Sequence, residues 1–449
     1  MRKHISLVFL VLVSMLLVAC GTPTPEIVEV TKIVEGTPKV VEVEVEVTST
    51  PEPVKLVVLT HWGEESVLTP MQARFDEYMQ LNPHVTIEYQ TTTFDQLLTK
   101  ITTARAAGIS PDVYHFYNLW MPEFVKGGML SVPPDEVVAD IRENYGTGSI
   151  DAVSYMGQVW GYPTEINTYQ LIYNKKLLQE AGYDSPPANW AELKEMACNI
   201  KQQDSDGNVT RAGFLVIPGW DSGVVHPFLS LLWSNGGEYL SADGTQALFD
   251  SAEGLATLKL YTDLLENKCT DLGISWGEFP SGKGGMVIMA NWWRATLMAT
   301  FEDGYENVGV APIPHGPNGQ SATIQYNWLW GVDNGSKYRE EAWKLVEWLN
   351  TPAKEGEASP IGDFLTSALG AIPSRTTDQE ALADRFDDFM QAFVDSAAVA
   401  RPEPVVPGGQ EVKTTLQIEI EAAWWGEKSP EEALTKASEE ANRILAEKQ

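Results

Sequence analysis

The start of the globular part of the chain shows two different patterns of apolar and polar residues. Val54 to Leu59 is a short apolar run typical of a buried strand, and the apolar positions from Val67 to Leu81 recur with helical spacing. A second strand is predicted over 84–89, a helix over 94–107 and a third strand over 112–117. This βαβαβ order predicts a parallel sheet with helices on its faces.

A second series of the same kind begins at Gln170 and runs to about residue 313. Beyond it the pattern is mostly helical, and helices are predicted over 338–349, 378–394 and 431–447. Two α/β series in one chain predict two lobes with a cleft between them. Because ligands of open α/β sheets bind beyond the carboxyl ends of the strands, functional side chains are expected in the loops that follow the strands.

The first twenty residues have the pattern of an export signal. A basic start is followed by an apolar run from Ile5 to Val18, which is too short for an ordinary membrane span. The run ends at Cys20 in a sequence that resembles the bacterial lipobox. We therefore expect residues 1–19 to be removed and Cys20 to carry a lipid that anchors the chain to the outer face of the cell membrane. The alternative is a plain signal peptide with an incidental cysteine.

Residues 20–53 form a segment of a different kind. It is rich in Thr, Pro, Val and Glu, and Glu and Val alternate strictly over 42–47. Such alternation can indicate a strand, but the like charges repel one another and no partner segment lies nearby. We interpret the segment as an extended, disordered acidic spacer, with an isolated β-ribbon as the alternative.

Composition narrows the possible partners. The 449 residues include 62 acidic and 31 basic side chains, a formal net charge of -31, which would repel a nucleic acid. The 15 Trp are a heavy load, so either the cores are unusually aromatic or some of these rings face a ligand.

Cysteine and metal patterns give weaker indications. With Cys20 assigned to the lipid, Cys198 and Cys269 are a possible disulfide, with two buried free thiols as the alternative. No Cys-x-x-Cys or His-x-x-x-His pattern occurs, so neither a metal nor a cofactor is expected. Asp204 to Asn208 looks like a calcium loop, but its glycine is misplaced for an EF-hand, and an Asp-Gly turn explains it better than a weak calcium site.

Aromatic residues stand beside polar ones in several of the loops that follow predicted strands. A flat ring can stack on the C–H face of a sugar, while carboxylates, amides and arginine bind its hydroxyls. For any single tryptophan, a place in the core is an equal alternative. The candidates for ligand binding in these loops are Trp62, Glu64, Tyr117, Asn118, Trp220, Asp221, Trp292, Trp293, Arg294 and Trp328.

Catalytic motifs fit poorly. Gly273 to Gly277 matches the Gly-x-Ser-x-Gly elbow of serine hydrolases, but a helix is predicted before it where the elbow needs a strand. A surface glycoside hydrolase would need two carboxylates, and Glu64, Glu165 and Asp221 are the candidates. We expect no enzyme and keep the glycoside hydrolase as the alternative.

The order of several short segments resembles extracellular solute-binding protein family 1 of bacterial ABC importers, whose members mostly bind sugars. The resemblance covers roughly residues 54–447. The segments that carry it include Ser110–Val113, Gly157–Pro163, Leu171–Leu177, Pro187–Leu193 and Ser281–Met286.

The resemblance implies a two-lobed α/β fold of the type II periplasmic-binding-protein kind, each lobe a mostly parallel sheet flanked by helices. It implies an N-terminal lobe of residues 54–165 plus 325–375 and a C-terminal lobe of 166–324 plus 376–449. It adds Glu165 to the ligand-binding candidates.

The resemblance also implies a function. A monomeric protein outside the cell would close its lobes on a carbohydrate, a di- or oligosaccharide, and deliver it to two permease subunits driven by a cytoplasmic ATPase. A polyol, a glycerol phosphate or a cationic solute is an alternative ligand.

Overall fold

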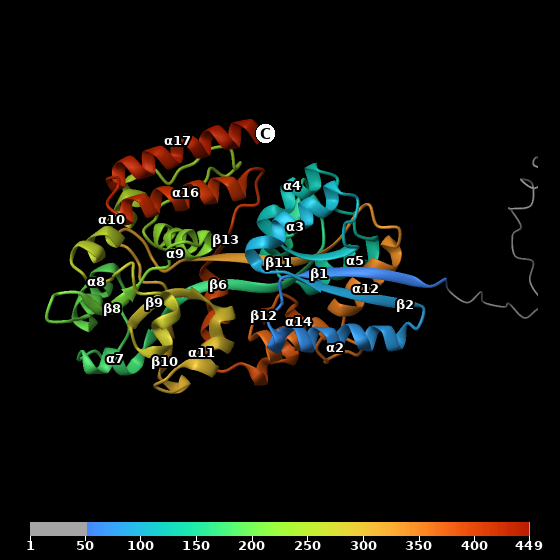
Figure 1. Ribbon diagram of the computed structural model, residues 1–449, viewed down its shortest axis with the longest axis horizontal. Coiled ribbons are helices and arrows are strands. Elements are labelled where there is room, and N and C mark those ends of the chain that lie inside the picture. Colours follow the sequence, from blue (N-terminus) through green and yellow to red (C-terminus); the bar gives the residue numbers. More distant parts are fainter. Residues whose placement is uncertain (1–51, 449) are drawn as a thin grey trace, which may run out of the picture. The chain divides into compact units, whose positions relative to one another are not determined.

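The computed structural model describes residues 52–448 (Figure 1). The predicted signal peptide, Cys20 and nearly all of the predicted spacer lie outside the described residues. From Val54 onwards the chain forms one compact unit. Within the described part, no helix is both long enough and apolar enough to cross a bilayer.

The βαβαβ unit predicted at the start of the globular part is confirmed. Its three strands run parallel with β1 in the middle, where Val58 lies beside Tyr89 of β2 and Val113 of β3. The apolar stripe of the first helix is buried, as the helical spacing predicts. The elements are β1 (Val54–Thr60), α2 (Glu65–Leu81), β2 (Val85–Thr91), α3 (Phe94–Ala106) and β3 (Val113–Tyr117).

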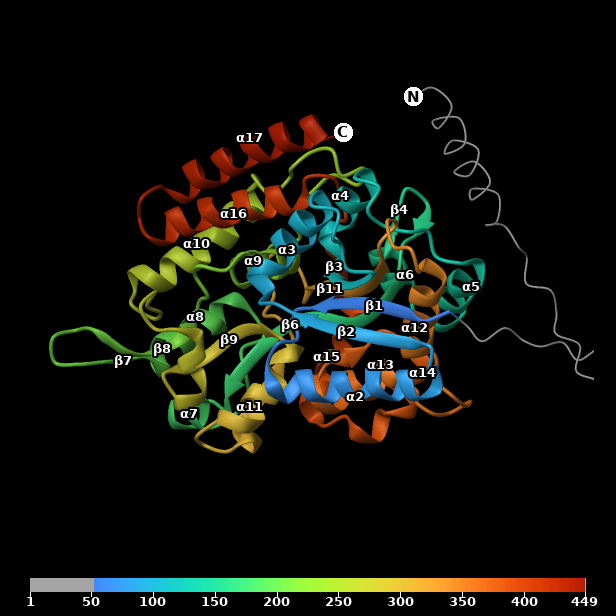
Figure 2. The same ribbon diagram turned by 45° about the vertical axis from the view of Figure 1, so that its right-hand side comes forward.

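Two long strands, β6 (Tyr162–Asn174) and β11 (Thr323–Val332), connect this unit to a second α/β group. β11 is antiparallel to β3 and to the first half of β6, while from Tyr169 onwards β6 pairs with strands of the second group. The result is a mixed sheet in the order β2-β1-β3-β11-β6-β9-β8-β7 (Figures 1 and 2). The mostly parallel sheet predicted for each lobe is wrong for the second group, where only β8 and β9 pair in parallel and the other pairs are antiparallel. The strands of the second group are β7 (Gln202–Gln203), β8 (Val209–Leu215), β9 (Gly284–Ala290) and β10 (Val308–Ala311).

We call the group built on β1, β2 and β3 the first lobe and the group built on β8, β9 and β10 the second lobe. Because β6 and β11 run through both groups, the predicted lobe boundaries stay a prediction. Further elements on the first-lobe side are α4 (Met121–Lys126), α5 (Asp135–Asn144), α6 (Thr147–Ala152), β4 (Ser154–Tyr155), β5 (Gln158–Val159), α12 (Arg339–Asn350), α13 (Pro360–Phe364), β12 (Ile372–Pro373) and α14 (Thr376–Ala381).

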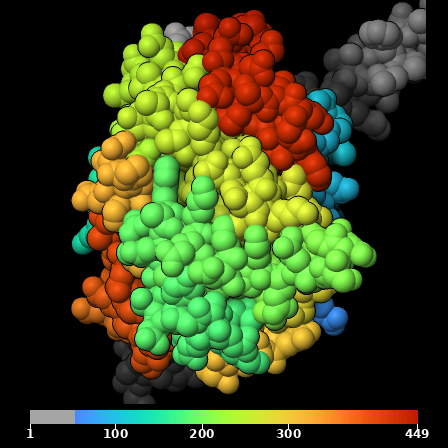
Figure 3. Space-filling model, turned by 90° about the vertical axis from the view of Figure 1, so that its left-hand side faces the viewer, coloured from blue at the N-terminus to red at the C-terminus, as the bar shows by residue number. Residues whose placement is uncertain are grey.

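The second lobe carries a layer of long helices. α16 packs against α9 and α17, and α17 also packs against α10. Figure 3 shows the red C-terminal helices beside the yellow-green atoms around α10. The elements here are α7 (Lys175–Glu180), α8 (Trp190–Ile200), α9 (Asp221–Ser234), α10 (Ala252–Glu266), α11 (Arg294–Thr300), α15 (Asp388–Ser396), β13 (Ala400–Pro402), α16 (Gly409–Trp424) and α17 (Pro430–Lys448).

The single helix predicted over 378–394 is wrong, because the chain divides there into α14 and α15. The side chain of Asp387 accepts a 3.0 Å hydrogen bond from the backbone N–H of Met390 and caps the second helix. The predicted helices over 338–349 and 431–447 are confirmed as α12 and α17.

Cys198 and Cys269 are joined by a disulfide between the end of α8 and the segment after α10, with their Cα atoms 4.5 Å apart. Gly213 of β8 lies next to this bridge. A Cβ atom at Gly213 would lie 1.8 Å from the carbonyl oxygen of Ala197, so only glycine lets α8 lie this close to the strand. Because the bridge closes a loop with a sequence separation of 71 residues, the chain-entropy model gives it on the order of 4 kcal/mol of stabilisation.

Candidate functional site

Three tryptophans of the second lobe bring their half-buried rings together. Trp220 precedes α9, Trp276 opens the short helix η2 (Trp276–Ser281), and Trp292 lies in η3 (Asn291–Trp293) after β9. The ring centroids of Trp220 and Trp292 are 5.9 Å apart, and the Trp276 ring is 6.4 and 6.5 Å from them. Because each ring is only partly buried, these residues, which we call the tryptophan cluster, leave aromatic surface exposed.

A cavity of about 370 Å³ opens beside this cluster, between η2 and α11. Rings, hydroxyls and one carboxylate line it together, a combination that suits a ligand with both apolar faces and hydroxyl groups. The lining includes Trp276, Trp292, Trp293, Thr296, Thr300 and Glu302.

A buried asparagine fixes the loop that carries Trp292. The side-chain oxygen of Asn291 accepts from the backbone N–H of Thr168 at 3.1 Å, and its amide donates to the carbonyl of Ile166 at 3.2 Å. The indole N–H of Trp292 donates to the hydroxyl of Tyr326 on β11 at 3.0 Å. The ring is therefore held by β6 and β11 without any ligand.

Two of the candidate tryptophans lie in the core of the first lobe instead. Trp62 is 3% exposed and its ring lies 4.2 Å from that of His115, while Trp328 is 5% exposed and stacks on His61 at 4.1 Å. Burial, reinforced by the neighbouring His115, holds the pKa of His61 well below its ordinary value. The rings of Trp62 and Trp328 are therefore part of the packed core of the first lobe.

The remaining first-lobe candidates are divided between interior and surface. Glu165 is buried on β6, where its carboxylate lies 3.6 Å from Nε2 of His115 and accepts from the hydroxyl of Thr164. Asn118 is also buried, and its side-chain oxygen accepts from the backbone N–H of Asn327 at 3.3 Å. Glu64 is exposed at the start of α2.

Arg294 is engaged within the protein. Its Nε and a terminal nitrogen lie 2.9 and 2.7 Å from Oδ2 of Asp387. Burial tends to raise the pKa of Asp387, but the guanidinium outweighs this effect and the pKa lies below its ordinary value. The positive charge of Arg294 is thus neutralised inside the fold. The neighbouring Trp293 is 1% exposed, so its ring belongs mainly to the core.

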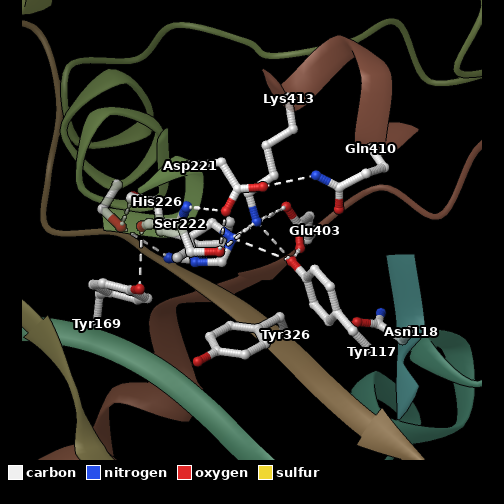
Figure 4. A network of polar contacts seen from close by, with 12 residues as sticks. Tyr117, Asn118, Tyr169, Asp221, Ser222, His226, Tyr326, Glu403, Gln410 and Lys413 are labelled. Carbon is white, nitrogen blue, oxygen red and sulfur yellow. Dashed lines mark hydrogen bonds and ion pairs between the residues drawn. The ribbon is translucent and has the colours of Figure 1, made fainter. Parts of the chain in front are cut away.

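Tyr117 and Asp221 meet in a buried polar network (Figure 4). The hydroxyl of Tyr117 donates to Glu403 and accepts from the ammonium of Lys413. The carboxylate of Asp221 accepts from Ser222 and from Gln410. The ring of Tyr117 lies 5.8 Å from that of Trp328 and 5.5 Å from that of Tyr326. It therefore connects the first-lobe core to the part of β11 that binds the indole of Trp292.

Six of the candidates therefore fall into two groups. Trp62, Glu165 and Trp328 surround His115 in the first lobe, whereas Trp220, Asp221 and Trp292 gather where α9 and η3 begin in the second lobe. Sequence reasoning missed Trp276, whose only indication was an aromatic residue inside the elbow-like motif. It also missed Glu403, Gln410 and Lys413, for which the sequence offers no indication at all.

The calcium-like segment forms the turn of the β7–β8 hairpin. One carboxylate oxygen of Asp204 accepts from the backbone N–H groups of Asp206 and Asn208, each at 2.9 Å, as in an Asx-type turn. Between residues 52 and 448, no group of three or more His, Cys, Asp or Glu side chains is arranged to hold a metal ion.

Comparison with known proteins identifies the family. The model of the bacterial extracellular solute-binding protein family matches residues 62–355. A binding protein of Brucella abortus (strain 2308) is 29% identical over 376 residues, which cover 81% of this chain and 87% of that protein. The maltotriose-binding protein of Pyrococcus abyssi is 24% identical over 307 residues, covering 66% of this chain and 62% of that protein.

Among solved structures, the GacH receptor of Streptomyces glaucescens, studied unliganded and in complex with acarbose, has a TM-score of 0.76 at 24% identity, covering 89% of this chain and all of that one. The chain belongs to the bacterial extracellular solute-binding protein family. Membership makes it a binding protein of ABC transport and not an enzyme, and the predicted two-lobed periplasmic-binding-protein fold is confirmed.

Proposed function

We propose that this protein captures a carbohydrate, a di- or oligosaccharide, at the tryptophan cluster of its second lobe. The observation that carries the proposal is the set of three half-buried rings within 6.5 Å of one another beside a cavity lined by hydroxyls. Such rings stack on sugar faces, and the similarity to a maltotriose-binding protein supports the same class of ligand here.

We further propose that the sugar closes the lobes and that the closed protein delivers it, as a monomer, to two permease subunits driven by a cytoplasmic ATPase. A ligand that touches both lobes favours the closed state by the contacts it makes only there. Trp220 and Trp292 supply the second-lobe side, and we propose that exposed Glu64 supplies the first-lobe side.

Other ligands have less support. A glycerol phosphate would need a free cation near the cluster, and the guanidinium of Arg294 is paired with Asp387. A polyol has too little flat C–H surface to use three rings. A cationic solute could use the aromatic surface, so it belongs in the test.

A thermal-shift screen of the mature protein tests the proposed ligand class. Maltose, maltotriose, other di- and oligosaccharides, glycerol, glycerol 3-phosphate and spermidine are compared. At a hundred times its dissociation constant, a bound ligand stabilises the fold by about 2.7 kcal/mol, a rise in Tm on the order of 3–5 °C. We expect such a rise with at least one oligosaccharide. A rise only with the phosphate or the polyamine would refute the carbohydrate assignment.

We also propose that the protein is exported and held on the outer face of the membrane by a lipid on Cys20, with residues 20–53 as the spacer. In cells, Cys20→Ser is expected to shift the protein from the membrane fraction to the medium or to block its processing. Thr24→Ser is the matched control, since it changes a nearby residue of the predicted spacer and leaves both Cys20 and the Cys198–Cys269 disulfide intact. Membrane association that survives Cys20→Ser would contradict lipidation.

A further inference from the structure

A buried lysine lies at the centre of the polar network below Trp220. Lys413 of α16 is 1% exposed, and its Nζ lies 2.9 Å from the hydroxyl of Tyr117, 2.8 Å from Oγ of Ser222 and 2.7 Å from Nε2 of His226 (Figure 4). The carboxylate of Glu403, 2% exposed, is 3.3 Å away. An ion pair so deeply buried is costly to desolvate and rarely adds stability over an apolar pair.

The polar atoms around Lys413 are close enough to form one continuous set of hydrogen bonds. An ammonium has three N–H donors, and Lys413 has three neutral acceptors besides its counter-ion. Burial, and then the charge of Lys413, hold the pKa of His226 well below its ordinary value, which favours the neutral ring. Its Nε2 lies 2.7 Å from Nζ of Lys413 and 3.1 Å from Oε1 of Glu403. The hydroxyl of Tyr117 donates a hydrogen bond to Glu403.

The network joins segments that are far apart in the sequence. Tyr117 ends β3 of the first lobe, Ser222 and His226 lie in the first turns of α9 of the second lobe, and Glu403 follows β13. A second bridge runs beside it: the indole N–H of Trp120 donates to Gln410 at 2.9 Å, and Gln410 donates to Asp221 at 2.7 Å. Both bridges hold the start of α9, directly after Trp220.

We infer that Lys413 is a positioning residue for ligand capture. Through its hydrogen bonds it holds the first turn of α9, and therefore Trp220, close to Tyr117 of the first lobe. Part of the contact between the lobes is therefore made by the protein's own side chains. This inference rests on the proposed function of the tryptophan cluster. The alternative is that the Lys413–Glu403 ion pair only neutralises two buried charges and has no role in ligand binding.

Two variants separate these explanations. Lys413→Met leaves Glu403 buried and unpaired, so a loss of Tm is expected under either explanation. Lys413→Met/Glu403→Gln removes both charges, and the Tm of the ligand-free protein is expected to return to within a few degrees of the wild type. If Lys413 positions Trp220, the double variant still binds maltotriose at least tenfold more weakly than the wild type. Wild-type affinity in the double variant overturns the inference.

Hydrogen exchange of the ligand-free protein provides a readout that does not depend on the sugar. In the double variant we expect at least tenfold faster exchange in the first turn of α9 and unchanged exchange in β1. Unchanged exchange in α9 overturns the inference. The matched control is Lys428→Met/Glu419→Gln, a half-buried pair on and after α16 that touches no network residue and is expected to change neither readout. If the wild type binds no sugar, the proposed function fails, while the exchange data still decide the role of Lys413.

Discussion

Replacing Trp292 with alanine is expected to weaken carbohydrate binding by about 2–3 kcal/mol, roughly 30–150-fold, with little change in stability. The ring is half buried, borders the cavity and is held by Tyr326 at 3.0 Å, so it is free to stack without reorganising. About 60 Å² of ring covered by a sugar contributes about 1.5 kcal/mol, and the aromatic contact adds about 0.5–1.5 kcal/mol. Calorimetric titration of wild type and variant measures the difference.

The next residue along the chain is the control. Trp293 is 1% exposed and packs against Trp276 and Phe279, with ring centroids 5.2 and 5.6 Å away. Trp293→Ala is therefore expected to lower the free energy of unfolding by about 3–5 kcal/mol, measured by urea denaturation. If a sugar binds the wild type and Trp292→Ala binds it equally well, Trp292 lies outside the site. If both variants lose stability alike, the distinction between them is wrong.

Lowering the pH from 7 to 5.5 is expected to destabilise the fold through three buried histidines. Burial lowers the pKa of His61, His115 and His226 below the ordinary 6.5. As the pH falls through 6.5, the unfolded chain takes up protons that the folded chain refuses, so stability is lost. Each histidine contributes about 1.4 kcal/mol per pH unit while the pH lies between its two pKa values. Glu403, whose pKa burial raises, acts in the opposite direction.

His61→Phe isolates one of these contributions. A phenyl ring can keep the stacking that His61 makes on Trp328 at 4.1 Å, but it does not titrate. Between pH 7 and 5.5 the variant is expected to lose about 1.3 kcal/mol less stability than the wild type, because the unfolded histidine takes up its proton mainly below pH 6.5. Urea denaturation at both pH values provides the comparison. An equal loss in both proteins would show that His61 is protonated in the folded state or is not buried.

The fold was largely predictable where one regular pattern decides one element. The apolar run of β1 and the spacing of α2 depend on local burial, and both elements lie where they were predicted. The predicted helix over 378–394 failed because the side chain of Asp387 caps a new helix there, and one polar residue does not disturb the apolar spacing. The antiparallel arrangement of β6 and β11 was not predicted, since pairing direction depends on contacts between residues over 150 positions apart.

The candidate site was predictable only in part. Loops after strands pointed to Trp220 and Trp292, because strand ends are readable from the sequence. The sequence does not show which of Trp292 and Trp293 is exposed. The two residues are neighbours in one loop, and only the fold shows that the ring of Trp293 is buried while that of Trp292 is half buried. Lys413 could not be found, because a lysine on an amphipathic helix ordinarily faces solvent and only the tertiary fold brings it to Tyr117.

The most direct test of the central claim is isothermal titration calorimetry of the mature protein. Maltotriose and the oligosaccharides that raise the Tm are titrated into the wild type and into Trp292→Ala, and the sugar is analysed afterwards. We predict one sugar bound per chain, intact after the titration, and binding by the variant that is weaker by the 30–150-fold derived above. Failure of every carbohydrate to bind, or equal binding by wild type and variant, would contradict carbohydrate capture at the tryptophan cluster.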